Sequence, residues 1–158
     1  MHQQLCDLLP RLRRFARSLS RDAHDADDVV QIALERALQR ASQWREEAGA
    51  LDAWMFGIVR NAWLDEVRAR QRRGRVFAAE EEGQEVGVAM LERHLQVVSV
   101  DAAMAQLPAD QREVVALVLV EGLSYREAAT LLEVPVGTVT SRLARGRQAL
   151  QRMLGDSM

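Results

Sequence analysis

Apolar residues recur three and four positions apart, the spacing of an α-helix, along most of this chain, and the spacing fails over one internal stretch. That stretch, residues 74–98, contains Gly83, Gly87 and a run of glutamates. The chain has three Trp, three Phe and one Tyr but abundant Ala, Leu, Arg and Glu, which favours helices over strands. We therefore predict an all-α fold of two small helical domains, residues 1–73 and 99–158, joined by a linker over residues 74–98.

Residues 1–73 are expected to form three helices. The first either kinks at Pro10 or begins there, because an interior proline removes a backbone hydrogen bond. Asp22 or Asp25 caps the second helix. The third begins near Leu51, and its expected exposed ridge consists of Arg60, Asn61, Asp65, Arg68 and Arg72.

Helix start and stop residues divide the C-terminal part of the chain. Pro108 suits the first turn of a helix that Gly122 ends. Ser124 and Glu127 have the spacing of a capping box for the next helix, and Pro135 opens the last one. Two short helices in this order, with small and apolar residues at their joint, predict a DNA-binding helix-turn-helix.

One face of the last helix is predicted to read DNA. Val139, Leu143, Gly146 and Leu150 share the buried face, so hydrogen-bond donors point the other way. Arginine pairs with guanine in the major groove, and hydroxyls suit phosphates or base edges. The alternative is a solvated, arginine-rich helix face. The expected DNA-binding residues are Thr138, Ser141, Arg142, Arg145 and Gln148.

The net charge of −2 argues against nucleic acid, but its distribution does not. Every basic residue is arginine, with five between Arg68 and Arg75 and four in the acid-free stretch from Arg142 to Arg152. No apolar run approaches the roughly 18 residues of a membrane span, so we expect a cytoplasmic protein. The single cysteine, Cys6, is expected to be a packed thiol.

From Leu107 onward, the sequence LPADQREVVALVLVEGLSYREAATLLEVPVGTVTSRLARGRQALQRML resembles the C-terminal DNA-binding domain of bacterial RNA polymerase sigma factors. In that family this domain recognises the minus-35 promoter element. Related modules also end response regulators, so this half alone leaves a two-component activator open. Two departures bear on the resemblance: Glu133 replaces a glycine common in the turn, and Thr140 stands where a basic residue is frequent.

The N-terminal half resembles the core-binding and minus-10 promoter domain of extracytoplasmic-function (ECF) sigma factors, in the segments DADDVVQIALERALQRASQW and LDAWMFGIVRNAWLDEVRARQRR. The resemblance implies that an acidic, glutamine-containing helix docks on a coiled coil of core RNA polymerase. An acid and amide ridge suits a basic helical partner. The alternative is an acid cluster that serves only the helix dipole. The implied polymerase contacts are Asp25, Asp28, Gln31 and Glu35.

The same resemblance implies minus-10 contacts from the third helix and from the loop before it, Gln43–Ala50. An extruded base needs stacking and hydrogen-bond partners, which Trp44 and Arg45 would supply. Trp44 as a half-buried packing residue is equally open. The arginine run beyond the helix would neutralise phosphates. The implied minus-10 contacts are Trp44, Arg45, Arg60, Asn61, Arg68 and Arg72.

These features predict an alternative sigma factor that binds core RNA polymerase and promoter DNA, with an anti-sigma factor as a further partner. We expect no enzymatic activity, cofactor, metal, small-molecule substrate or membrane insertion. A magnesium site at Asp25, Asp27 and Asp28 lacks a second acidic cluster, and Cys6 and the three histidines include no C-x2-C or H-x3-H pair for zinc. The serious alternative is an activator that does not dock stably on polymerase; a helical adaptor is a weaker one.

Overall fold

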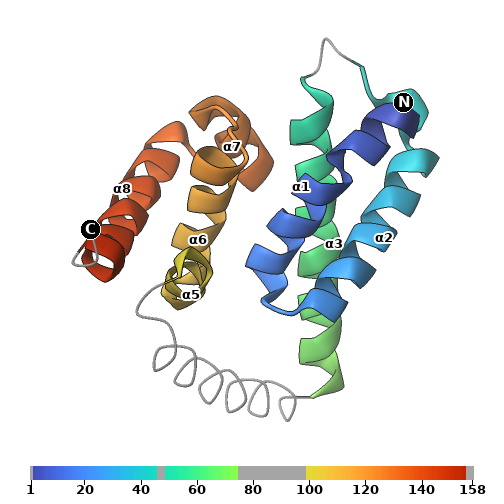
Figure 1. The fold of residues 1–158 in the computed structure, drawn as a ribbon. Coiled ribbons are helices and arrows are strands. Elements are labelled where there is room, and N and C mark those ends of the chain that lie inside the picture. The colour runs from blue at the N-terminus through green and yellow to red at the C-terminus, as the bar shows by residue number, and fades with distance from the viewer. Residues whose placement is uncertain (1, 46–48, 75–98, 156–158) are drawn as a thin grey trace.

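The computed structural model describes residues 2–45, 49–74 and 99–155, and all regular structure in these ranges is helical. The all-α prediction is confirmed. Residues 75–98, almost the whole predicted linker, lie outside the described residues. Figure 1 shows helices α1, α2 and α3 side by side in an N-terminal half and α5 to α8 gathered in a C-terminal half.

The N-terminal half is the predicted set of three helices, α1 (His2–Ser20), α2 (Ala23–Gln39) and α3 (Leu51–Arg73), with a short 3₁₀ turn η1 (Ala41–Gln43) after α2. Asp22 caps α2, since its side chain accepts a hydrogen bond from the Asp25 amide at 2.9 Å. Of the two alternatives for Pro10, a helix that begins there is wrong, because α1 starts eight residues earlier and continues through the proline. Cys6 is exposed, not packed: the neighbouring Leu5 occupies the buried face at that level of α1.

The C-terminal half consists of α5 (Val100–Gln106), α6 (Ala109–Val115), a π-helical turn η3 (Ala116–Val120), α7 (Tyr125–Leu132) and α8 (Val136–Leu154). The helix predicted between Pro108 and Gly122 is thus α6 continued by η3. Gly122, at φ 81°, ends it in a conformation that suits glycine.

The predicted capping box at the start of α7 is confirmed. The Ser124 hydroxyl accepts from the Glu127 amide at 3.0 Å, and the Glu127 carboxylate accepts from the Ser124 amide at 2.9 Å. Two amides at the helix start are thereby satisfied by side chains. The box fixes where α7 begins and so sets the position of the turn before α8.

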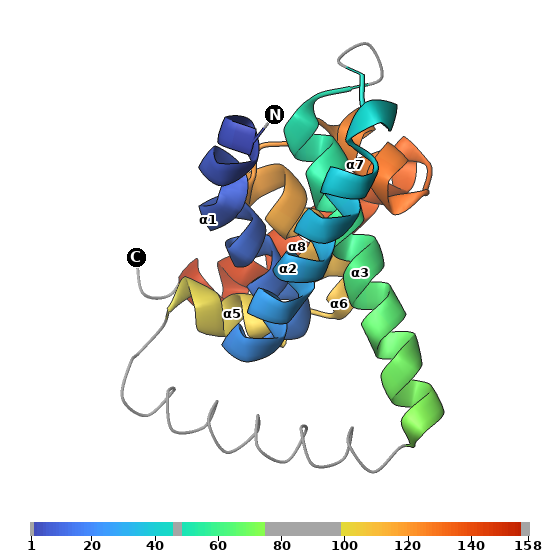
Figure 2. The ribbon, with the colours of Figure 1, turned by 90° about the vertical axis from the view of Figure 1, so that its right-hand side faces the viewer.

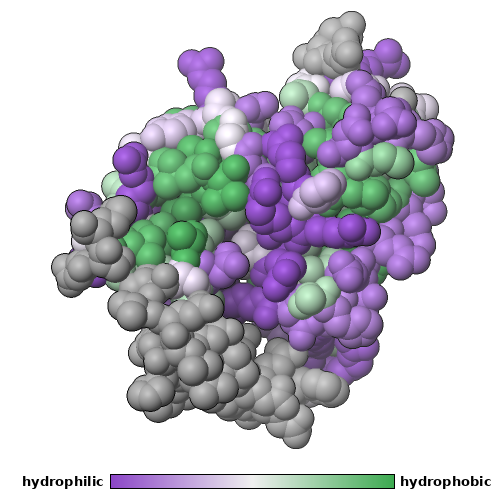
Figure 3. Space-filling view, viewed as in Figure 1, coloured by the Kyte–Doolittle hydropathy of each residue, from purple (hydrophilic) through white to green (hydrophobic). Residues whose placement is uncertain are grey.

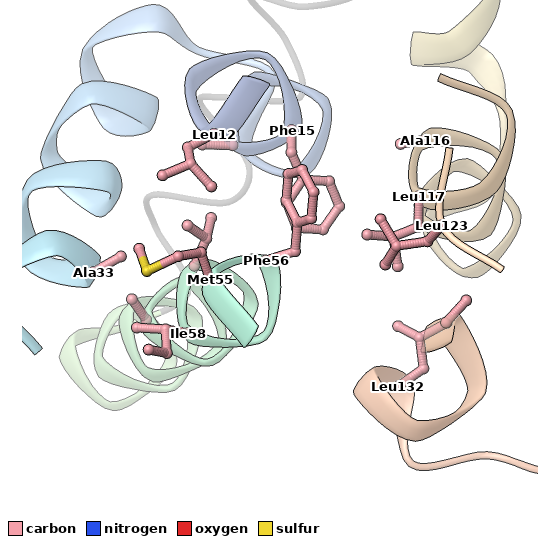
Figure 4. Close-up of a cluster of buried hydrophobic side chains, with 14 of the residues drawn as sticks. Leu12, Phe15, Ala33, Met55, Phe56, Ile58, Ala116, Leu117, Leu123 and Leu132 are labelled. Carbon is pink, nitrogen blue, oxygen red and sulfur yellow. The ribbon is translucent and has the colours of Figure 1, made fainter. Parts of the chain in front are cut away.

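One cluster of buried apolar residues draws on both halves. The Phe15 and Phe56 rings meet edge to face with centroids 5.3 Å apart. Figure 4 shows Leu117 and Leu123 of the C-terminal half pointing toward this aromatic pair. Across the two halves, α7 packs against α3 and α6 packs against α1, and the two views in Figures 1 and 2 agree on this placement. The two halves therefore share a core.

Gly146 lets α8 approach α6 closely. A Cβ added at this position would lie 2.7 Å from a methyl carbon of Val115, whereas a Cβ added at Gly137, in the first turn of α8, would meet nothing within 4 Å. We predict that Gly146→Ala lowers the free energy of unfolding by about 1–3 kcal/mol through overpacking. Urea denaturation followed by circular dichroism measures this.

Gly137→Ala is the matched control. It adds the same methyl group to the same helix without a clash, so stability should stay unchanged or rise by up to about 1 kcal/mol. Equal destabilisation by both variants would mean that Gly146 is needed for a reason other than the close approach to Val115.

Candidate DNA and protein interfaces

The structure brings the five predicted residues of α8 onto the face that points away from the core. Val139 and Leu143 are buried on the opposite face. Ser141, Arg145 and Gln148 are exposed, whereas Thr138 is half-buried. Arg142 keeps 27% of its side-chain exposure and reaches toward Asp110 of α6, at 3.6 Å. The face thus presents donors from α8, one of which, Arg142, is paired with an acid of α6.

The first turn of α8 is open for an anion. Pro135 is the residue before the helix and cannot cap it with a hydrogen-bonding side chain, and no acidic residue lies in the first turn. Free backbone amides and the positive end of the helix dipole therefore meet at the helix start. A DNA phosphate is the kind of group that such a terminus binds.

The four predicted polymerase contacts lie on one side of α2. They line an open groove of about 340 Å³ together with Glu66 and Arg70 of α3. Asp28, Gln31 and Glu35 are exposed, whereas Asp25 is half-buried and pairs with Arg70 at 2.8 Å. Three of the four side chains are thus accessible from solvent. The fourth ties α2 to α3.

Arg70 holds the base of this groove. Its guanidinium lies 5.4 Å from the centroid of the Trp63 ring and pairs with Glu66 at 3.1 Å as well as with Asp25. Trp63 is half-buried beneath it. The stacking and the two carboxylates orient the arginine toward α2.

Of the predicted minus-10 residues, Trp44 and Arg45 follow η1 directly. Arg45 is exposed. Trp44 is half-buried, and its indole N–H is buried without a hydrogen-bond acceptor among the residues that the structure describes. Residues 46–48 of the predicted base-capturing loop lie outside the described residues. A donor in this state suits a partner that brings its own acceptor.

On α3, Asn61, Arg68 and Arg72 are exposed as predicted. The prediction of an exposed Arg60 is wrong. Its side chain is 18% exposed, and its Nε donates to the Glu113 carboxylate of α6. The pair joins the two halves across 53 positions of sequence, which the pattern of a single helix cannot reveal.

Two buried charged residues had no role in the sequence prediction, Arg112 and Glu121. Arg112 donates to the carbonyl oxygen of Leu107 at 3.0 Å and so fastens α6 to the end of α5. Glu121 accepts from arginines of α1. Glu121 interrupts an otherwise apolar stretch, a signal that marks it as paired but does not name the partner, whereas Arg112 lies among polar residues and carries no such signal.

The part of the chain that the structure describes holds no group of three or more His, Cys, Asp or Glu side chains placed to bind a metal ion. Within the same ranges, no helix is both long and apolar enough to cross a membrane. His94, considered above for zinc, lies outside the described residues.

Two family models match the chain in order. Sigma-70 region 2 matches residues 7–73, and the region 4 model of the same family matches residues 98–150. The matched segments are the two helical halves described above.

Curated relatives cover nearly the same span. The ECF RNA polymerase sigma factor EcfG of Rhodopseudomonas palustris is 38% identical over 150 residues, which covers 92% of this chain and 80% of the relative. SigM of Mycobacterium tuberculosis, also an ECF RNA polymerase sigma factor, is 39% identical over 147 residues, covering 91% and 71%. Among solved structures, the sigma factor RpoE of Bartonella quintana in complex with the anti-sigma factor NepR has a TM-score of 0.76 and 30% identity, with 98% of this chain and 96% of that chain covered.

The turn between α7 and α8 is strained at Glu133. The residue has φ 58° and ψ 44°, in the left-handed region, and its side chain is exposed. A residue with a Cβ is destabilised there by about 1–2 kcal/mol of conformational free energy, and glycine avoids part of this cost. We predict that Glu133→Gly raises the free energy of unfolding by about 0.5–1 kcal/mol, measured by urea denaturation.

Glu133→Ala serves as the control, because it removes the same exposed carboxylate but keeps the Cβ. It should not stabilise the protein. A gain of equal size in both variants would assign the effect to charge and not to backbone strain.

Proposed function

The chain belongs to the ECF sigma factors of the sigma-70 family and acts as an alternative sigma factor that binds core RNA polymerase and directs transcription initiation, and we propose how its two halves divide this work. In this proposal residues 1–73 hold core polymerase and contact the minus-10 element, residues 74–98 link the halves, and residues 99–158 read the minus-35 element. The observation that carries the proposal is the match of two successive regions of one family, each to one helical half.

We propose that the polymerase docks on the acidic side of α2, through Asp25, Asp28, Gln31 and Glu35. Support comes from their common groove and from the exposure of three of them. Carboxylates and an amide in a row attract a basic helical partner and fix its register. Asp25 contributes by keeping Arg70 turned toward the groove.

The minus-10 contacts in the proposal fall into two groups. Trp44 and Arg45 receive an extruded base, supported by the buried indole N–H that finds no acceptor among the described residues. Arg60, Asn61, Arg68 and Arg72 contact the phosphates or bases beside it. Arg60 joins them only after it leaves Glu113.

The minus-35 contacts in the proposal are the donors on α8, namely Thr138, Ser141, Arg142, Arg145 and Gln148. The open first turn of α8 supports a phosphate contact next to them. Arginines on such a face pair with guanine, and the hydroxyls contact the backbone.

Three further statements belong to the proposal. The protein works in the cytoplasm, where its polymerase and promoter are. It does no chemistry of its own and leaves catalysis to the polymerase. An anti-sigma factor controls it, by analogy with the Bartonella quintana relative, whose structure was solved in complex with one.

The direct test adds the purified chain to core polymerase and measures specific transcription from promoters selected out of genomic fragments. The two together should initiate where core alone does not, and they should comigrate on gel filtration. Upstream DNA binding without comigration would support the activator instead.

Arg145 is predicted to read the minus-35 element, because it is exposed on the outward face of α8 and has no ion-pair partner among the described residues. Arg145→Ala should weaken minus-35 recognition by about 1–3 kcal/mol, roughly five- to 150-fold. Affinity for promoter fragments, measured by fluorescence anisotropy, tests this. The control is Arg147→Ala, an exposed arginine on another side of the same helix, which should change affinity far less.

Asp28 and Glu35 are predicted to set the affinity for core polymerase. Reversing both charges, Asp28→Arg with Glu35→Arg, should weaken core binding at least about tenfold, because like charges would then face each other. Surface plasmon resonance with immobilised core measures this. Asp7→Arg, an exposed charge reversal on α1, is the control. Equal losses would point to a general charge effect and away from a docking site on α2.

A further inference from the structure

A buried carboxylate joins the two halves. The Glu121 side chain, at the end of η3, has 0% exposure. It accepts from Nε and Nη2 of Arg14 at 2.8 and 2.7 Å and from Nε of Arg11 at 3.3 Å. Arg11 also donates to the Glu121 carbonyl oxygen at 2.6 Å. The acid comes from the C-terminal half, and both arginines come from α1 in the N-terminal half.

The surroundings keep these arginines in place. The Arg11 guanidinium lies 5.2 Å from the centroid of the Phe56 ring and 3.3 Å from Asp52 of α3. The hydrogen bond to Glu121 raises the pKa of the Arg14 guanidinium above its ordinary value. Glu121 therefore meets two guanidinium donors that are already oriented.

A second ion pair crosses the same boundary. Arg60 of α3 and Glu113 of α6 keep only 18% and 12% of their side-chain exposure. Apolar packing also crosses the boundary, because a Cβ added at Gly57 of α3 would lie 3.8 Å from the Leu131 side chain of α7. Figure 3 shows the hydrophilic band between apolar areas of the two halves.

Promoter geometry is incompatible with this closed arrangement. The positions for which the minus-10 and minus-35 elements are named lie about 25 base pairs apart, or about 85 Å at about 3.4 Å per base pair. A compact chain of 158 residues has a radius of gyration of about 15 Å and is thus about 40 Å across. The 24 residues between Gly74 and Ser99 can span about 80 Å when extended. The halves must therefore separate before both elements are bound.

We propose that the ion pairs of Glu121 with Arg11 and Arg14 form an interdomain latch, which the pair of Arg60 and Glu113 reinforces. The latch holds the free sigma factor closed and opens when the protein engages polymerase and promoter. This inference rests on the proposed assignment of the two halves to the two promoter elements. It makes the closed state self-inhibiting without any partner. Arg60 has a double use, since it pairs with Glu113 in the closed state and is released toward DNA in the open one.

Charged groups suit such a latch because water stabilises them once they separate. Inside the boundary each hydrogen bond to a charged group contributes about 1.5–3 kcal/mol, and on opening both partners regain hydration. Promoter phosphates offer Arg60 a replacement for Glu113. The boundary is thereby specific when closed and reversible.

Distances in the free protein test the latch without polymerase. Spin labels on the exposed Cys6 of α1 and on Gln151→Cys of α8 report the separation of the halves by pulsed electron paramagnetic resonance. The wild type should give one narrow, short distribution. Glu113→Gln with Glu121→Gln should raise the ratio of open to closed molecules at least about tenfold.

Two controls separate the latch from general effects. Asp7→Asn with Asp27→Asn removes two exposed charges within the N-terminal half and should leave the distribution unchanged. Glu113→Arg alone should open the molecule, and Arg60→Glu with Glu113→Arg should close it again, because the exchanged pair restores attraction. Helix content by circular dichroism confirms that each variant is folded. Unchanged distances in both glutamine and arginine variants would overturn the latch.

Promoter binding supplies the functional readout. In the presence of core polymerase, the double glutamine variant should bind a promoter fragment that carries both elements more tightly, by up to the factor by which its open fraction rises. If the labels report opening but affinity for this fragment stays the same, the latch does not inhibit and that part of the proposal is wrong. If even the wild type fails to bind core, the proposed function falls, while the distances still decide whether the latch exists.

Discussion

The boundary between the two halves is the contact on which the rest of this structure depends, because each half is too small to bury a large core of its own. Phe56 lies at its centre, fully buried, edge to face with Phe15 and beneath the Arg11 guanidinium. The apolar cluster continues from there into Leu117 and Leu123. Removing the boundary exposes this surface, so the closed state gains stability from burial while the polar groups around it decide how the halves are aligned.

The polar and apolar parts of the boundary act differently when the halves separate. Exposing apolar area costs free energy regardless of how the two halves are oriented. The carboxylate of Glu121, by contrast, is stabilised only where Arg11 and Arg14 contact it or where water replaces them. An ion pair thus selects one closed geometry among many that would cover Phe56. The same reasoning applies to Arg60 and Glu113. A boundary of this mixed kind resembles a transient interface more than the inside of a domain.

Local chemistry made the helices predictable. Ser124 and Glu127 cap α7 as their spacing indicated, whereas the sequence left the turn geometry at Glu133 open and the structure places this residue in the left-handed region. Buried faces were also predictable, since Val139 and Leu143 follow the helical period. Where prediction failed, the cause lay in distant contacts or local context. Arg60 has the spacing of an exposed residue but pairs with a residue of the other half. Cys6 is exposed because the neighbouring Leu5 occupies the buried face. Pro10 lies inside α1 because interrupting the helix there would cost more free energy than the hydrogen bond that the proline removes. The assignment of residues to polymerase and DNA remains a prediction, because it depends on partners and not on the fold.

Pairing of charges across the boundary bears on how a chain with a net charge of −2 binds DNA. Acids of one half neutralise arginines of the other at the boundary, as with Glu121 and Arg14 or Glu113 and Arg60. The outward face of α8 carries Arg145 without an acid beside it in the helix. In the proposed open state, Arg11 and Arg14 of α1 and Arg60 of α3 lose these acidic partners. An open molecule presents more unpaired arginine to phosphates than a closed one, so its affinity for DNA should also depend more steeply on salt.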